Sequence, residues 1–297
     1  MEMSYAIQAT NVKKKFKGFE LDIPEFHIPK GFATALIGEK GAGKSTLLNI
    51  LAGIRLDYKG QITYLDEKET DVEKVKERIG YTGPGNYFLP GWNIGQIEDI
   101  SKMLFESFDG EKFKLLCNEL GITNGASDTG KKVSSLSDGN RMKLVIATVL
   151  ARETECLLMD EPASPLDPLM RDKLCEMIRN YLVEGNGEKS VLFSTHNISD
   201  MENVTDYAII LEHGNVVEEG FVEDLKEKYV LIKGEKKDAE AAKNILYSFS
   251  SNNYGFEGIC LSEDVDKLAG MDISMETPTL FQISVAVMKA NTKIKLA

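Results

Sequence analysis

The chain has 297 residues, 42% of them hydrophobic and 28% charged, and its formal net charge is -12 at pH 7. That length is enough for one large domain with a small one, or for two modest domains. The acidic balance repels a nucleic-acid backbone, so we expect no nucleic-acid partner. No apolar run approaches the about 20 residues of a membrane-spanning helix, and lysines make the first 28 residues too polar for a secretory signal. We therefore expect a cytoplasmic protein, which needs a membrane-spanning partner for any membrane role.

The first predicted elements are strands of two kinds. Three short strands, Tyr5–Gln8, Phe19–Ile23 and Gln61–Leu65, are bounded by turn residues and predict a small antiparallel sheet. Between the last two lies Ala33–Ile37, whose mostly apolar residues are typical of a strand that is buried on both faces. A glycine-rich turn follows that strand, and a helix is predicted from about Lys44 to Leu51.

The middle of the chain has a helical pattern. Apolar residues recur at helical spacing from Gly91 to about Gly121, and a further helix is predicted from near Ser137 through Leu150. We interpret the region of about 85–150 as a helical insertion. Strands and helices then alternate, which implies a mainly parallel sheet with right-handed crossovers. These later elements are predicted at Cys156–Met159, Pro168–Leu182, Val191–Ser194, Tyr207–Leu211 and Asn215–Glu218, the last two as a hairpin.

The pattern changes once more near residue 228. We place a domain boundary there, with one domain at 1–228 and a small accessory domain at 229–297. The accessory domain is predicted to have the order strand, helix, strand, helix, at Tyr229–Lys233, Asp238–Phe249, Phe256–Leu261 and Thr277–Lys289.

A glycine-rich motif between the predicted strand Ala33–Ile37 and the helix after it fits the phosphate-loop pattern of Gly, four residues, Gly, Lys, then Ser or Thr. Its glycines let consecutive N–H groups converge on phosphate oxygens, and the next helix points its positive end at the same anion. We expect Lys44 to reach the β- and γ-phosphates, Ser45 to ligate Mg²⁺ and Thr46 to reach the α-phosphate. The motif consists of Gly38, Glu39, Lys40, Gly41, Ala42, Gly43, Lys44 and Ser45.

Two carboxylates follow a second buried strand directly, at Asp160 and Glu161. Ligands of open α/β sheets bind at the carboxyl ends of the strands, so Asp160 is well placed for the Mg²⁺ of a nucleotide that Lys44 holds. Glu161 can polarise a water for attack on the γ-phosphate. The predicted fold class is therefore α/β: a phosphate-loop NTPase core with a mainly parallel sheet, a small antiparallel β subdomain, a helical insertion and a small C-terminal α+β appendage.

Three further motifs occur in the chain after the phosphate loop, before and after the acidic pair Asp160 and Glu161. Leu136-Ser137-Asp138-Gly139-Asn140 precedes the Asp160 strand, Ser164-Pro165-Leu166-Asp167 follows it, and His196 comes after the next predicted strand. With them, residues 5–225 resemble the nucleotide-binding subunit of ATP-binding-cassette transporters, whose signature is usually Leu-Ser-Gly-Gly-Gln.

The resemblance implies roles for the matching residues, with ATP and Mg²⁺ as ligands. Phe16 matches the aromatic residue on which adenine stacks. Ser137 and Gly139 match the signature, which in the family grips the γ-phosphate of ATP on the opposite protomer. Asp167 matches the loop that links the two active sites. Glu161 matches the catalytic glutamate, and His196 matches the switch histidine that contacts the γ-phosphate.

The resemblance also implies partners. Two cassette subunits, identical or homologous, would sandwich two ATP molecules head to tail, because one chain does not complete a site. An integral-membrane permease would receive the closing motion through the helical insertion. The subunit is then expected to lie on the inner face of the cell membrane as a peripheral protein.

The chain departs from the family pattern at two places. Asp138 replaces a signature glycine, and a carboxylate close to a triphosphate is unfavourable unless it points away or meets a cation. Pro84 stands where the family normally has a glutamine that contacts Mg²⁺ and the permease, and it does not replace the amide. Asn86 and Gln96 lie further on as the nearest amides.

The subgroup is suggested by two further segments. Leu192–His196 and Pro278–Phe281 look similar to bacterial exporters of the ABC-2 type, which predicts export of a drug, peptide or similar compound. The alternative is a cassette ATPase of iron–sulfur assembly or DNA maintenance. DNA-maintenance members usually carry long coiled-coil or zinc-binding insertions, which this sequence lacks, and co-purification with a membrane protein would separate the assembly role.

Overall fold

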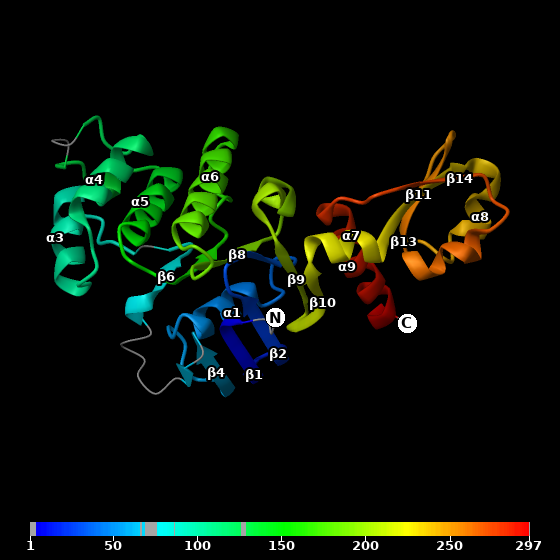
Figure 1. Ribbon diagram of the computed structural model, residues 1–297, viewed down its shortest axis with the longest axis horizontal. Coiled ribbons are helices and arrows are strands. Elements are labelled where there is room, and N and C mark those ends of the chain that lie inside the picture. The colour runs from blue at the N-terminus through cyan, green and yellow to red at the C-terminus, as the bar shows by residue number, and fades with distance from the viewer. Residues whose placement is uncertain (1–3, 66, 69–75, 86, 126–128, 297) are drawn as a thin grey trace.

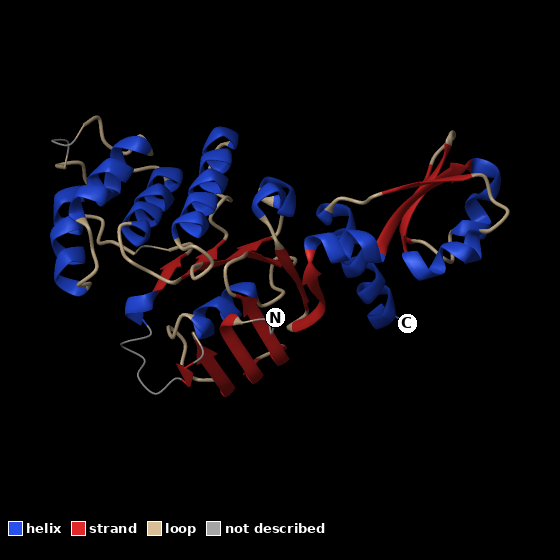
Figure 2. Ribbon diagram, viewed as in Figure 1, coloured by secondary structure: helices blue, strands red, loops and turns tan. Residues whose placement is uncertain are grey.

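The computed structural model describes residues 4–65, 67–68, 76–85, 87–125 and 129–296. The molecule is elongated and has three sheets: a central sheet and an antiparallel sheet lie together in one half, and a C-terminal sheet lies at the other end (Figure 1). The central sheet has the helices α5 (Asp138–Leu150) and α6 (Pro168–Glu184) on one side, and the helix α1 (Lys44–Leu51) and an antiparallel sheet on the other (Figure 2). This is the α/β class that the sequence predicts, with its parallel sheet, its β subdomain and its helical insertion.

The central sheet has six strands in the order β10-β9-β3-β8-β7-β6. Every neighbouring pair is parallel except β9 and β10, which form the predicted hairpin. Sequence analysis missed β6, whose four residues include a glycine. The strands are β3 (Ala33–Ile37), β6 (Ile79–Thr82), β7 (Cys156–Asp160), β8 (Ser190–Thr195), β9 (Tyr207–Glu212) and β10 (Asn215–Phe221).

The two faces of this sheet belong to two different hydrophobic clusters. Along β7, Leu157 and Met159 pack into the cluster on the side of α5 and α6, whereas Leu158 packs with α1 and the antiparallel sheet. Successive side chains of a strand point to opposite faces, so an apolar run without alternation is what a sheet covered on both sides requires. Apolar burial on both faces therefore holds the carboxyl ends of the central strands in place.

The antiparallel sheet is larger than its predicted strands. Its order is β2-β1-β4-β5, and β1 continues for eight residues beyond Gln8 to Phe16. The extension was missed because three consecutive lysines, Lys13 to Lys15, lie near its end, yet Lys13 pairs with Asp22 of the neighbouring strand at 2.8 Å. The strands are β1 (Tyr5–Phe16), β2 (Phe19–Pro29), β4 (Lys59–Tyr64) and β5 (Glu67–Lys68).

Four helices of the first 228 residues, α3, α4, α5 and α6, begin at side-chain caps, as short polar residues before apolar periods predict, whereas α1 and α7 have no side-chain cap. The side chain of Asn93 accepts a hydrogen bond from the Gln96 N–H, and the side chain of Gln96 accepts one from the Asn93 N–H. These two bonds form a capping box at the start of α3. Asp109 caps the next helix. These helices are α1 (Lys44–Leu51), α3 (Ile94–Leu104), α4 (Gly110–Glu119), α5 (Asp138–Leu150), α6 (Pro168–Glu184) and α7 (Val222–Lys228), with short 3-10 turns at Val133–Ser135, Ile198–Asp200 and Glu202–Val204.

The C-terminal elements form a four-stranded antiparallel sheet in the order β12-β13-β11-β14. The predicted helix Asp238–Phe249 is wrong, because only Ala239–Ala242 is α-helical and Tyr247 already pairs with Ile259 in the sheet. The missed strand β14 completes the sheet. The elements are β11 (Tyr229–Glu235), α8 (Ala239–Ala242), β12 (Tyr247–Ser251), β13 (Gly255–Leu261), β14 (Ile273–Glu276) and α9 (Leu280–Leu296), with 3-10 turns at Lys236–Asp238 and Ser262–Leu268.

Helix α9 packs back against both parts of the chain. It contacts β9 and β10 of the central sheet as well as β12 and β13 of the C-terminal sheet. Its buried residues Leu280, Ile283 and Ala286 belong to the same hydrophobic cluster as the central strands, and the Leu280 N–H donates to Glu202 Oε1 at 2.8 Å. The division of the chain into two domains near residue 228 stays a prediction. Among the described residues, no helix is long and apolar enough to cross a membrane.

The packing of α9 predicts the cost of removing one leucine. Leu280→Ala should lower the free energy of unfolding by about 2–5 kcal/mol, because Leu280 has no exposed surface and its loss leaves a cavity. The same change at Leu169, also in a first helical turn but 83% exposed, should alter it by about 0.5 kcal/mol or less. Urea unfolding followed by circular dichroism measures both, and equal midpoints for the two variants would show that α9 does not complete the core.

Candidate active site

The phosphate loop joins β3 to α1, and its glycines occupy positions that other residues tolerate poorly. Gly41 and Gly43 have positive φ angles of 91° and 110°, a region that favours glycine. A Cβ atom at Gly38 would lie 2.3 Å from the Leu211 carbonyl oxygen, and one at Gly43 would lie 2.9 Å from the Phe19 ring. The glycines therefore let the loop turn tightly while it lies against β9 and the β1–β2 hairpin.

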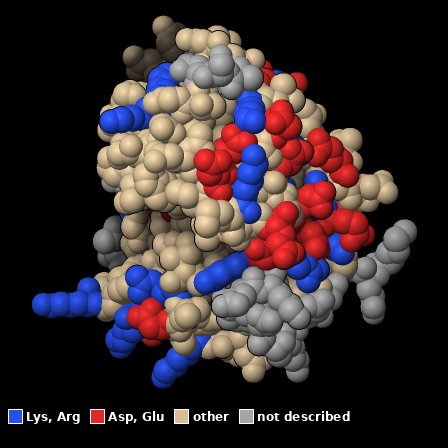
Figure 3. Space-filling view, turned by 90° about the vertical axis from the view of Figure 1, so that its left-hand side faces the viewer, with Lys and Arg blue, Asp and Glu red and all other residues tan. Residues whose placement is uncertain are grey.

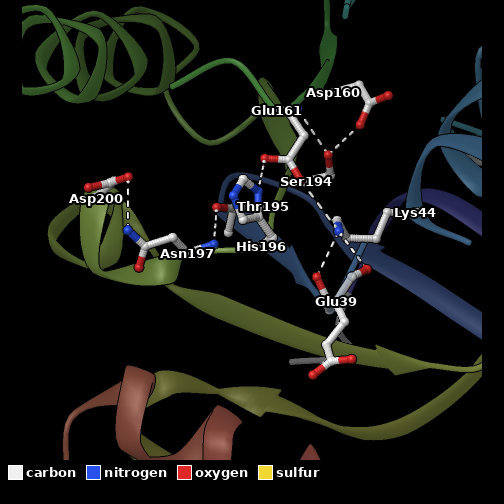
Figure 4. A network of polar contacts seen from close by, with 10 residues as sticks. Glu39, Lys44, Asp160, Glu161, Ser194, Thr195, His196, Asn197 and Asp200 are labelled. Carbon is white, nitrogen blue, oxygen red and sulfur yellow. Dashed lines mark hydrogen bonds and ion pairs between the residues drawn. The ribbon is translucent and has the colours of Figure 1, made fainter. Parts of the chain in front are cut away.

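Lys44, the first residue of α1, points back into this loop (Figure 4). Its side chain is only 6% exposed, and its ammonium group donates to the Gly38 carbonyl at 2.7 Å and to the Glu39 carbonyl at 3.2 Å. Oε1 of Glu161 lies 3.4 Å away. A buried ammonium needs such partners, and oxygens of a phosphate anion would suit it equally well.

Asp160 ends β7 inside the protein, with 1% of its surface exposed. Its Oδ1 accepts a hydrogen bond of 2.5 Å from Ser194 Oγ, which in turn accepts the Glu161 N–H at 3.0 Å (Figure 4). Ser194 lies opposite Asp160 in the β7–β8 register. Sequence analysis gave Ser194 no role in the site, although a hydroxyl at the end of a strand predicted beside β7 was the available signal. Ser194 thus fixes both consecutive acidic residues.

Glu161 and His196 form a pair at the mouth of the site. Oε2 of Glu161 lies 2.8 Å from Nδ1 of His196, and the Glu161 backbone has a left-handed φ of 51°. Such a conformation is uncommon for a residue with a side chain, and it is held here by the bond to Ser194. The turn after His196 is fixed by Asn197, which donates to Thr195 Oγ1 and to Asp200 Oδ2.

A cleft of about 730 Å³ lies over the phosphate loop. Several predicted site residues line it, whereas Asp160 lies in a neighbouring hollow, and Gly38, Glu39, Ala42, Ser137, Gly139 and Asp167 line neither space. The predicted residues that line the cleft are Phe16, Lys40, Gly41, Gly43, Lys44, Ser45, Thr46, Glu161 and His196.

Phe16 lies at the turn end of the β1–β2 hairpin and lines the cleft. Its ring centroid is 6.0 Å from that of Phe19, which lines the cleft as well. The Lys14 ammonium and the Arg55 guanidinium lie 5.4 Å and 5.3 Å from the Phe16 ring centroid. The cleft therefore has an aromatic wall with cations behind it, which suits a planar base.

The residues of the signature and of the loop before α6 have structural roles in the free chain. Ser137 caps α5 by accepting the Asn140 N–H at 3.3 Å, and Asp167 caps α6 by accepting the Met170 N–H at 3.1 Å. A Cβ atom at Gly139 would lie 2.9 Å from a backbone carbonyl oxygen. The side chain of Asp138 is 88% exposed and lines the cleft together with Arg141, with which it pairs at 3.2 Å, so it meets a cation.

A smaller hollow of about 330 Å³ lies beside the cleft, and both Ser45 and Asp160 line it. Magnesium prefers oxygen ligands and keeps several waters beside one or two carboxylates and substrate phosphates. The hydroxyl of Ser45 and the buried carboxylate of Asp160 fit that ligand set. The described part of the chain contains no group of three His, Cys, Asp or Glu side chains that could hold a metal.

Gln96 does not take the place of the missing glutamine. Its Oε1 accepts the Asn93 N–H at 3.0 Å, so its side chain is committed to the cap of α3. Pro84 lines both the cleft and the smaller hollow, where it offers no side-chain hydrogen bond. Asn86, the other expected amide, lies outside the described residues.

Comparison with known proteins gives this arrangement a family. Residues 21–164 match the family model described as ABC transporter. The chain is 30% identical over 223 residues to the tungstate uptake system ATP-binding protein TupC of Peptoclostridium acidaminophilum, which covers 72% of this chain and 99% of that protein. It is 31% identical over 210 residues to the uncharacterized ABC transporter ATP-binding protein YxlF of Bacillus subtilis. That match covers 68% of this chain and 66% of the YxlF protein.

Two further comparisons delimit the match. Human ATP-binding cassette sub-family A member 6 is 28% identical over 223 residues, but the chain spans only 13% of that protein's length. The dimeric structure of MJ0796, a bacterial ABC transporter cassette, has a TM-score of 0.63 at 23% identity and covers 72% of this chain and 98% of that one. The chain belongs to the ABC transporter family and is an ATPase cassette of that family. Its relatives include an uptake protein, so the predicted exporter subgroup does not follow from them.

The contacts of Ser194 predict the effect of removing its hydroxyl. Ser194→Ala should lower the free energy of unfolding by about 1–3 kcal/mol, because it leaves the buried Oδ1 of Asp160 without its donor. Ser134→Ala removes a hydroxyl from an exposed serine and should be nearly neutral. Chemical denaturation measures both variants, and equal stabilities would mean that the hydroxyl does not hold Asp160.

Proposed function

We propose that this chain binds ATP with Mg²⁺, hydrolyses it as half of a head-to-tail dimer, and powers a separate membrane permease. The observation that carries the proposal is the convergence of Lys44, Glu161 and His196 at one mouth, with the Glu161 carboxylate touching both other groups. This is the arrangement that phosphoryl transfer to water needs: a cation for the phosphates and a base for the water.

The phosphates would lie on the loop, where N–H groups and the start of α1 favour an anion. Lys44 binds them through its ammonium group, which in the free chain is held by two carbonyls and Glu161. Ser45 and Asp160 would hold the Mg²⁺, which when bound neutralises charge on the phosphate oxygens. Asp160 is kept in place for this by the Ser194 hydroxyl.

Glu161 would accept the proton of the attacking water at its carboxylate. Its Oε2 is oriented by Nδ1 of His196, and its backbone by Ser194. His196 itself lines the cleft and is available to the γ-phosphate. The left-handed φ of Glu161 turns the carboxylate away from the buried Asp160 and toward the mouth. The two adjacent acids can therefore take different roles, one with the metal and one with the water.

A second cassette subunit, identical or homologous, is supported by the position of the signature. Asp138 lines the cleft of its own chain, but its neighbours Ser137 and Gly139 do not, although they start a helix whose N–H groups suit an anion. A nucleotide held by another protomer would be their natural ligand. The pair of Asp138 with Arg141 offsets the charge that the unusual aspartate adds there.

A membrane permease is supported by the surface of the helical insertion. Met103 is 84% exposed at the end of α3, and Leu89, Leu104 and Leu115 also face solvent. This end of the molecule shows a broad uncharged area with acidic side chains gathered beside it (Figure 3). Exposed apolar side chains of this kind are typical of protein interfaces. Bound to a permease, the chain would be peripheral on the inner face of the membrane.

The direction of transport is a finer part of the proposal. The segments Leu192–His196 and Pro278–Phe281 support export of a drug, peptide or similar compound, whereas similarity to a tungstate uptake protein supports import. An ATPase of iron–sulfur assembly or DNA maintenance remains the alternative to transport, and the permease experiment below separates it.

The proposed base predicts the behaviour of Glu161→Gln. Hydrolysis should fall by about 100- to 10,000-fold, because an amide does not accept the proton of the water. ATP binding should persist, and the nucleotide-bound dimer should accumulate. Phosphate release and size-exclusion chromatography with ATP and Mg²⁺ measure the two effects.

Glu153→Gln is the matched control for this change, since Glu153 is exposed and lies outside the cleft. It should hydrolyse ATP at the parent rate. If Glu161→Gln also kept the parent rate, Glu161 would not be the base.

The proposed permease predicts what accompanies the chain in its native membranes. A mild-detergent affinity pull-down should recover a polytopic membrane protein. Met103→Asp should reduce that recovery, because it places a charge on the exposed apolar surface. Met275→Asp makes the same change at an exposed position of β14 and should leave recovery unchanged. Recovery only from the soluble fraction, with assembly proteins or nucleic acid, would overturn transport and leave the ATPase standing.

A further inference from the structure

Two tyrosine hydroxyls crowd around one point beside the carboxylate that ends β7. Tyr81 lies in β6, and Tyr87 lies in the segment that leads from β6 to α3. A Cβ atom placed on Gly83 would be 2.9 Å from the hydroxyl oxygen of each tyrosine and 3.1 Å from Cβ of Asp160. The two oxygens therefore converge on the space next to Asp160, and Gly83 leaves that space open to them.

The same two tyrosines line the hollow in which Ser45 and Asp160 meet. The remaining lining residues supply one amide, Asn49, and otherwise apolar side chains or backbone. The hydroxyl of Tyr81 donates to Asn49 Oδ1 at 2.9 Å, so its hydrogen is directed to α1. Tyr87 as a whole residue is 39% exposed.

Both hydroxyls lie in a partly buried environment. Burial raises the pKa of Tyr81 above its ordinary value, and the nearby Tyr87 and Asp160 raise it further. Burial is also the main reason why the pKa of Tyr87 is raised, with a contribution from the negative charge of Asp160. A neutral phenol donates one hydrogen bond and accepts others without adding charge. A side-chain amide likewise donates and accepts hydrogen bonds without a charge, whereas the side chain of Pro84 does neither at this place.

We propose that Tyr87 is a positioning residue for the metal: its hydroxyl hydrogen-bonds a water of the Mg²⁺ that Ser45 and Asp160 hold, in place of the glutamine that this chain lacks. Tyr81 is held by its hydrogen bond to Asn49 and supports the ring of Tyr87. The centroids of the two tyrosine rings are 6.2 Å apart. The inference rests on the proposed function, because it needs a nucleotide and its metal at this site. Tyr87 stands before α3, so it also joins the metal to the start of the helical insertion.

The test measures metal affinity directly and does not depend on turnover. Mn²⁺ replaces Mg²⁺, a non-hydrolysable ATP analogue is present, and free Mn²⁺ is followed by electron paramagnetic resonance. Tyr87→Phe should weaken Mn²⁺ binding by about 10-fold, the lower end of what outer-shell partners of a metal contribute. Binding of the analogue in EDTA, without metal, should match the parent protein, which a general disturbance of the site would not allow.

Tyr254→Phe is the matched control, since Tyr254 is 94% exposed in the C-terminal sheet region. It should bind Mn²⁺ as the parent does. Thermal unfolding checks that both variants are folded, and loss of one hydroxyl from a partly exposed ring should leave Tyr87→Phe folded.

The other possible outcomes test either the role of Tyr87 or the proposed ATPase function. If the parent binds analogue and Mn²⁺ and Tyr87→Phe binds both equally well, the role of Tyr87 is overturned and the ATPase proposal stands. If Tyr87→Phe weakens analogue binding in EDTA as much as Mn²⁺ binding, Tyr87 acts on the nucleotide and not on the metal, and the role is overturned too. If the parent itself binds neither analogue nor Mn²⁺, the proposed function fails.

Discussion

The buried ammonium group of Lys44 is the constraint on which the site depends. A charge that is almost wholly removed from water must be surrounded by oxygens, and here they come from the phosphate loop after β3 and from Glu161 after β7. Those oxygens meet only because parallel strands end at one edge of a sheet that is buried on both faces. The position of the Lys44 ammonium group therefore depends on the arrangement of the central strands. Ser194 holds Asp160 and Glu161 in place through its hydrogen bonds to both residues.

Much of the core was predictable, because long apolar strands and capped helices are local signals. The strands β3, β7 and β8 and the helices α1, α5 and α6 were predicted within a few residues. Strand β6 was missed because it is short and holds Gly80, where a Cβ would press on Val149 and Leu157 from distant elements. The helix predicted at Asp238–Phe249 failed because pairing of Tyr247 with β13 overrode a local helical pattern.

Some residues of the site were predictable from the sequence, and others were not. The phosphate loop and the acids after β7 lie within contiguous motifs, so their residues could be named from the sequence. Ser194 and the two tyrosines belong to no motif, and their importance comes from contacts between segments far apart in the chain. Sequence departures such as Pro84 show where the family's usual side chain is absent, but only the fold shows which other side chains lie near that place.

Helix α9 has a consequence for how the protein comes into being. Helix α9 contacts β9 and β10, strands that are synthesised well before it, and its buried face shares one hydrophobic cluster with β9. Until α9 emerges from the ribosome, the side chains that it covers on those strands stay exposed to water. Contacts of such large sequence separation form slowly, and exposed apolar surface in the interval invites association. A nascent cassette of this kind should therefore be a client of chaperones until its last helix docks.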